Sequence, residues 1–223
     1  MTHSYKPFIL IIIISLGIIV GVSALYYSAR TYQVAKDIKT QKITPTPTPE
    51  APIIRDVKEE VKRNEQQILA EPGNLDLLKS QASSFLLLGE NEKSINTYLQ
   101  AIQLTPQDAD LYVGLGDAHV QANSTSQAIE AYEMAMSLDP QLIHVYVQLA
   151  NIYTIKQPDR TNVIDTYIKG IQSNPNNILL RILFSSFYEQ IQEKELALEQ
   201  YQRVLQIDPT NSIAIRKIEQ LSK

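Results

Sequence analysis

Apolar residues recur at helical spacing through the C-terminal part of the chain, and a proline closes every second run. A tyrosine opens the closing stretch of each such run, eight residues before the proline. The prolines are spaced 34, 35 and 34 residues apart. The pairs are Tyr98 and Pro106, Tyr132 and Pro140, Tyr167 and Pro175, and Tyr201 and Pro209. A fixed period of this size is typical of stacked repeats, whose units bury their apolar stripes against one another.

Each repeat predicts two helices. In the first helix of one unit an apolar stripe follows 3.6-residue spacing, formed by Tyr112, Leu115, Gly116 and His119. The next unit repeats it with Tyr146, Leu149, Ala150 and Tyr153. The second helix places small residues on either side of its tyrosine, and proline ends it because proline cannot continue a helix. The pattern therefore predicts a helix–turn–helix pair per unit.

These positions resemble the tetratricopeptide repeat (TPR) family, whose pattern is an aromatic residue, Leu-Gly, Tyr, then Ala, an aromatic residue and a final Pro. The unit 109–142 fits nearly throughout, with Tyr112 in place of tryptophan and His119 in place of the first tyrosine. The resemblance implies an all-α fold, a right-handed superhelical solenoid of helix–turn–helix repeats. It covers residues 75–211 as four units, which are 75–108, 109–142, 143–177 and 178–211. The third unit has one extra residue, which we place in its loop near Gln157–Arg160.

Two further segments flank the predicted units. Residues 53–74 show helical periodicity and end near Pro72, which lies 34 residues before Pro106. We expect a leading capping helix or half repeat there. Residues 212–223 resemble the closing helix of the family and predict a C-terminal capping helix.

An uncharged stretch stands near the start of the chain. After a short tail (1–7), residues 8–27 carry no charge, and twenty apolar residues are long enough to cross a bilayer. We expect a transmembrane signal anchor that holds a single-pass protein in the lipid bilayer. A cleaved signal peptide is the alternative, with a small-residue site at Val22-Ser23-Ala24. Gly17 and Gly21 have the spacing that allows close helix approach, so the span could support a homodimer.

Residues 28–52 form the predicted juxtamembrane segment and Thr/Pro-rich linker, in which the prolines of Ile43–Pro52 favour an extended spacer. More Lys and Arg residues follow the span than precede it, which favours a cytoplasmic C-terminal side. The signal-like N-terminus and the linker composition favour the opposite side. We favour the extracytoplasmic side, and the sequence leaves both open.

Composition excludes several functions. The net charge is −4, so no basic footprint for nucleic acid is expected. Without cysteine there is no disulfide framework, thiolate nucleophile or cysteine zinc site. The three histidines stand in no metal-binding motif, and no phosphate-binding glycine loop or nucleophile elbow is present. We expect no cofactor, no metal and no catalytic residue, and hence no enzyme.

The predicted binding surface is the face of the first helices that points away from their packing stripe. Stacked units use such a concave face to bind partners. Helical spacing places thirteen residues on it: Asp76, Lys79, Ser83, Asp110, Val113, Asp117, Val120, His144, Val147, Asn151, Leu179, Ile182 and Ser186. The resemblance implies a Lys/Asn clamp for a C-terminal carboxylate in some members. Lys79 fits that clamp, but Ser83 and Gly114 replace its asparagines, so we expect no clamp.

The mixed acidic and apolar character of this face suits an extended or helical peptide with apolar anchors and some positive charge. The function we expect is a membrane-anchored protein–protein interaction scaffold, which binds a partner protein or peptide in the groove of its array. One alternative is a self-associating structural spacer. Another is a regulatory arm of an envelope complex with no groove ligand, which rests on analogy alone.

Overall fold

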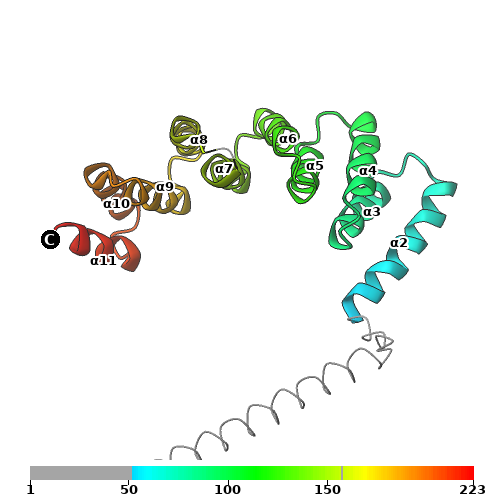
Figure 1. The fold of residues 1–223 in the computed structure, drawn as a ribbon, viewed down its shortest axis with the longest axis horizontal. Helices are drawn as coiled ribbons and strands as arrows, with labels where there is room; N and C mark the ends of the chain where they lie inside the picture. Colours follow the sequence, from blue (N-terminus) through cyan, green and yellow to red (C-terminus); the bar gives the residue numbers. More distant parts are fainter. Residues whose placement is uncertain (1–51, 157) are drawn as a thin grey trace, which may run out of the picture. The chain divides into compact units, whose positions relative to one another are not determined.

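The computed structural model describes residues 52–156 and 158–223, and within them the chain is helical throughout (Figure 1). The predicted transmembrane segment 8–27, the tail before it and nearly all of the linker lie outside the described residues. Among the helices described, none has both the length and the apolar character needed to cross a membrane. The α-helices are α2 (Pro52–Ala70), α3 (Leu75–Leu87), α4 (Asn91–Leu104), α5 (Ala109–Gln121), α6 (Thr125–Leu138), α7 (Ile143–Asn151), α8 (Arg160–Ser173), α9 (Ile178–Gln190), α10 (Lys194–Ile207) and α11 (Ser212–Leu221).

The helices form successive pairs, and each helix packs on its neighbours in sequence. The pairs are α3 with α4, α5 with α6, α7 with α8, and α9 with α10, while α2 precedes them and α11 follows (Figure 1). The predicted all-helical solenoid of helix pairs is therefore confirmed.

Asparagine or aspartate caps most of the helices that follow a closing proline. The side chain of Asn74 accepts a hydrogen bond from the Leu77 amide at the start of α3. Asp108, Asn177 and Asn211 cap α5, α9 and α11 in the same way. Each stands two residues after its proline. Such caps satisfy backbone N–H groups that have no partner within the helix, so one short motif ends a unit and starts the next.

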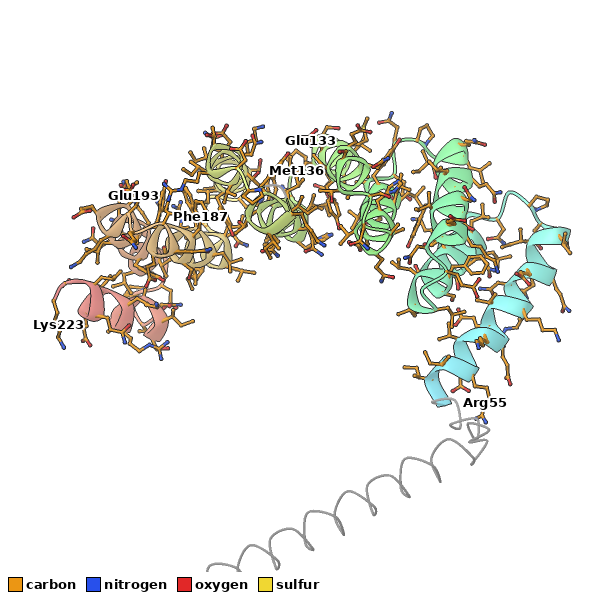
Figure 2. The ribbon with its side chains drawn as sticks, in the orientation of Figure 1. Arg55, Glu133, Met136, Phe187, Glu193 and Lys223 are labelled. Atoms are coloured by element: carbon orange, nitrogen blue, oxygen red, sulfur yellow. The ribbon has the colours of Figure 1, made fainter. Side chains whose placement is uncertain are left out.

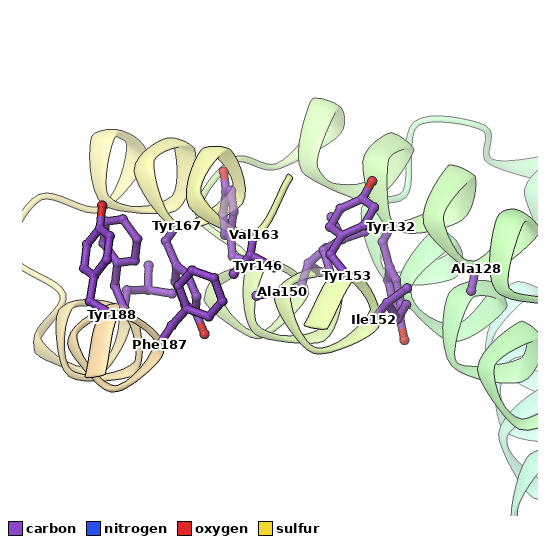
Figure 3. Packing of buried hydrophobic residues seen from close by; sticks show 14 of the residues in the cluster. Ala128, Tyr132, Tyr146, Ala150, Ile152, Tyr153, Val163, Tyr167, Phe187 and Tyr188 are labelled. Carbon is purple, nitrogen blue, oxygen red and sulfur yellow. The ribbon is translucent and has the colours of Figure 1, made fainter. Parts of the chain in front are cut away.

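The recurring tyrosines form the centre of each unit. Tyr132 and Tyr201 are fully buried, and Tyr98 and Tyr167 nearly so. Figure 3 shows the rings of Tyr132 and Tyr167 inserted between the helices. A small residue of the first helix makes room for the ring: a Cβ atom built on Gly116 would lie 2.5 Å from the Tyr132 ring. The small residue and the tyrosine are thus two halves of one contact.

The third pair departs from the sequence prediction. Its extra residue does not lie in the inter-helix loop near Gln157–Arg160. Instead α7 continues into a π-helical segment, Ile152–Lys156, before α8 starts at Arg160. A wider π turn absorbs one residue while the helix keeps its direction. Tyr153 therefore stays buried at the position that His119 holds in the preceding unit.

Helix α2 takes the place of a second helix, but its inner face is polar. Asn64 stands 34 residues before Tyr98 and is buried like it. Its Nδ2 atom donates to the Ser80 Oγ atom at 3.0 Å, and that hydroxyl donates to Glu60 Oε1 at 2.7 Å. A polar inner face suits the end of a repeat array, because end units must remain soluble.

Candidate functional site

The thirteen predicted binding residues lie on four first helices, and none of them is buried. We call them the first-helix surface. Helices α3, α5, α7 and α9 position them, because each helix buries its opposite stripe in the core. The structure also contains three clefts that are lined by other side chains. The first-helix surface is thus an accessible strip rather than one of these clefts.

Hydroxyl groups of the buried tyrosines reach this surface from behind. The Tyr98 hydroxyl lies 3.0 Å from Ser83 Oγ, and the Tyr132 hydroxyl donates to Asp117 Oδ1 at 2.5 Å. Both partners precede their tyrosine by 15 residues, so the repeat geometry makes the same contact twice. Asp117 is consequently a half-buried acceptor with a structural task.

The tyrosine hydroxyls remain protonated at neutral pH. Burial, together with the hydrogen bond to Asp117, raises the pKa of Tyr132 well above its usual value. Burial raises the pKa of Tyr167 to about 12. Burial, and the bond to Glu189, raise the pKa of Tyr201 to about 12. These groups therefore act as neutral hydrogen-bond donors and bring no charge to the first-helix surface.

The α3–α5 part of the surface is acidic. The Lys79 ammonium pairs with Asp108 Oδ2 at 2.5 Å, and this hydrogen bond raises the Lys79 pKa. Asp76 and Asp110 also raise it through their charges, and both are exposed. Because Asp108 already engages Lys79, the two exposed carboxylates dominate what a ligand would meet here.

The α7–α9 part of the surface is more apolar. Leu179 is 53% exposed on α9, whereas Ile182 is half-buried and packs on the C-terminal core cluster. Val113 and Val147 are also half-buried and pack on the central cluster. Leu179 therefore offers most of the free apolar area in this part, and the valines contribute only their outer edges.

The two described histidines do different things. His119 is half-buried, and burial lowers its pKa, which keeps it neutral at pH 7. His144 is exposed on α7. Within residues 52–156 and 158–223, no group of three or more His, Asp or Glu side chains could hold a metal ion.

Sequence reasoning missed the contacts that join one unit to the next. Tyr112 and Tyr146 donate from their hydroxyls to the carbonyl oxygens of Pro106 and Pro140, at 3.1 and 3.0 Å. Tyr146 also lines a cleft of about 490 Å³ with Glu133 and Met136 of α6, two residues labelled in Figure 2. The signal was present in the sequence: these tyrosines stand where the family has tryptophan, six residues after each proline.

Comparison with known proteins agrees with this geometry. A TPR repeat model matches residues 82–122, and a tetratricopeptide repeat model matches residues 109–142 and 180–211. These parts of the chain are therefore tetratricopeptide repeats. No curated protein matches the chain by sequence.

Solved structures share the fold. A crystal structure of MamA has a TM-score of 0.60 at 20% identity, over 70% of this chain and 91% of that one. MamA from Desulfovibrio magneticus RS-1 has a TM-score of 0.56 at 13% identity, over 70% and 88% of the two chains. YrrB, described as a TPR protein with an unusual peptide-binding site, has a TM-score of 0.52 at 18% identity, over 72% and 82%.

Proposed function

We propose that this tetratricopeptide-repeat array is a membrane-anchored scaffold, which binds a segment of a partner protein along its first-helix surface. The observation that carries the proposal is the division of labour on the first helices. One face of each is buried by the tyrosines and small residues of the core. The other face carries exposed carboxylates on α3 and α5 and an exposed leucine on α9.

The chemistry of this surface indicates the ligand. Asp76 and Asp110 favour Lys or Arg on the part of the ligand that meets α3 and α5, because opposite charges attract and guide association. Leu179 favours an apolar anchor at the other end of the strip. One of the fold relatives, YrrB, is described as having a peptide-binding site, which supports a peptide as the ligand class.

The membrane part of the proposal rests on the sequence. Residues 8–27 have the length and apolar character of a span, and the prolines of residues 43–52 favour an extended spacer before the array. We propose that the span holds the array at the bilayer, on its extracytoplasmic side.

Charge reversal tests the binding surface. Asp76→Lys with Asp110→Lys should reduce capture of the partner from native membranes in mild detergent by at least about tenfold, because two attractive contacts become repulsive. Asp117 is left unchanged, since it holds Tyr132.

Asp165→Lys with Glu199→Lys is the matched control. These two residues are exposed on the second helices α8 and α10, and the charge change is the same. Equal capture by both double variants and the parent chain would contradict the proposal and favour a self-associating spacer.

A further inference from the structure

The interface between α2 and α3 differs from all later interfaces at one linking position. In the later units a long side chain donates to the carbonyl oxygen of the preceding closing proline. Tyr112, Tyr146 and Arg181 make these bonds to Pro106, Pro140 and Pro175, at 3.1, 3.0 and 3.0 Å. The first unit has Leu78 at this position, which is shorter and has no donor. No link of this kind to Pro72 is possible from leucine.

A second substitution lies one helical turn away. Leu115, Leu149 and Phe184 occupy a core position in the later units, and Gln81 replaces them in the first. Gln81 is only 3% exposed, and neither its Nε2 nor its Oε1 atom has a hydrogen-bond partner within the described residues. A buried amide without partners is costly, and native structures contain few of them.

The two substitutions border the same cleft. It has a volume of about 400 Å³ and lies between α2, α3 and α4. Leu78, Gln81 and Phe85 of α3 form one wall, and Ile68 and Leu69 of α2 form another. Leu69 is 83% exposed, although it lines an apolar space. None of these residues belongs to the first-helix surface, so this is a different site.

We propose that this cleft binds a second segment of a partner protein, which inserts an aromatic side chain where the other units use their own tyrosine. The apolar wall of Ile68, Leu69 and Leu78 accepts the ring. A rotation of the Gln81 side chain presents its amide to the bound segment. The amide then donates to a main-chain carbonyl and accepts from a main-chain N–H, which a peptide supplies as a pair.

This occupant satisfies both unusual positions at once. A purely apolar ligand would leave Gln81 without partners, and a small polar ligand would leave Leu69 and Ile68 in water. An aromatic residue with its own peptide groups meets both demands, because its ring is apolar and its backbone is not. The site would let the array hold a partner at two places, whether or not the first-helix surface binds.

Titration with N-acetyl-L-tyrosine amide tests the proposal. The full-length chain in mild detergent is labelled at Ile and Leu methyl groups and observed by NMR. The methyl signals of Ile68, Leu69 and Leu78 should shift and saturate. N-acetylglycine amide, which lacks the ring, should bind at least about tenfold more weakly, because it buries little apolar area.

Two variants restore what the other units have. Leu78→Tyr fills the cleft and should abolish the shifts of Ile68 and Leu69. Gln81→Leu removes the amide and should weaken the probe about tenfold, the factor expected for one hydrogen-bonded contact. Met136→Ala is the matched control, since Met136 stands at the place of Ile68 in the α6 cleft and should leave binding unchanged.

The proposal is overturned if these methyl signals do not move with the probe, or if Leu78→Tyr binds it as well as the parent chain does. Shifts that depend on protein concentration without any probe would also overturn it, because they would assign the cleft to a second copy. An unshifted Leu115 methyl signal shows that each variant remains folded.

Discussion

Each buried tyrosine joins three parts of its surroundings. The ring of Tyr132 fills the space left by Gly116, and its hydroxyl reaches Asp117 on the first-helix surface. The Tyr98 ring also lies against the following unit, since a Cβ atom on Gly114 would come within 2.3 Å of it. Phenylalanine would fill the same space but would leave the polar partner unsatisfied. The tyrosine is therefore the residue that couples the core of a unit to its outer surface.

Replacing Gln81 with leucine should stabilise the array by about 1–3 kcal/mol, the cost of a buried polar group without partners. Leucine is the residue that two other units carry at this position. Urea unfolding followed by circular dichroism measures the change. The reverse substitution, Leu115→Gln, should destabilise the array, and the prediction fails if both substitutions shift stability in the same direction.

Replacing Gly116 with alanine should destabilise the array by about 1–3 kcal/mol, because the new Cβ atom overlaps a fully buried ring that must shift. Gly73→Ala is the control: nothing lies within 4 Å of its Cβ position, so stability should change by less than about 0.5 kcal/mol. Thermal unfolding of the two variants compares them directly. Equal midpoints would mean that the Tyr132 ring has more room than the structure shows.

At the level of helices, the spacing of tyrosine and proline was enough to predict the pairs. A proline every 34 or 35 residues ends a second helix, and the Asn or Asp that follows it usually caps the next first helix. The extra residue of the third unit was assigned to a loop instead of the π-helical segment Ile152–Lys156. The sequence count shows that one residue is added, but hydrogen bonding in the folded chain decides where it goes.

The candidate site was less predictable than the helices. Helical spacing identified the exposed face, because burial of one stripe leaves the other in solvent. It did not show that Asp108 pairs with Lys79 or that Asp117 accepts from Tyr132. Those contacts depend on side chains from different helices, whose relative positions are set by packing. The cleft beside Gln81 was missed, although the repeat register marks Gln81 as the polar exception at a core position.

Helix α11 should dock through Ala214, which is fully buried against Tyr201 and Val204. Ala214→Asp places an unpaired charge there and should undock the helix, because a buried carboxylate without a partner is very costly. Hydrogen exchange should show lost protection in α11 and unchanged protection in α5 and α6. Ile213→Asp, at a 40% exposed position, should leave α11 protected. Loss of protection in both variants would mean that α11 is only weakly held.

Across the whole array, the core is a series of adjoining clusters rather than one centre. One cluster covers the first two units, a second runs from Ala128 to Ala197, and a third joins α10 to α11. Repeat proteins are stabilised in this way, by units and the interfaces between neighbours. The buried tyrosines recur in all these clusters, so a condition that ionises tyrosine acts on the entire array.

Stability should therefore fall between about pH 10 and pH 12. The pKa of Tyr167 and that of Tyr201 are raised to about 12 in the folded chain, and unfolded tyrosine has a pKa of about 10. Below pH 10 both states keep the proton and stability is full, whereas above it only the unfolded chain loses the proton. Each such tyrosine should cost about 2–3 kcal/mol by pH 12.

Urea unfolding from pH 8 to 12 checks this expectation. Tyr201→Phe should be less stable than the parent chain at pH 8, because it leaves Glu189 without its 2.6 Å bond. It should nevertheless lose less stability on going to high pH. A flat profile for the parent chain would show that the buried tyrosines do not govern the alkaline limit.

Site-specific photocrosslinking in native membranes tests the central claim most directly, because it reports which face of the array touches the partner. A benzoylphenylalanine at His144 or Leu179, both exposed on the first-helix surface, should join the full-length chain to the same partner on irradiation. The same residue at Asp165 or Glu199, exposed on the second helices, should give no such product. A common product from the second-helix positions, with none from His144 or Leu179, would contradict the account.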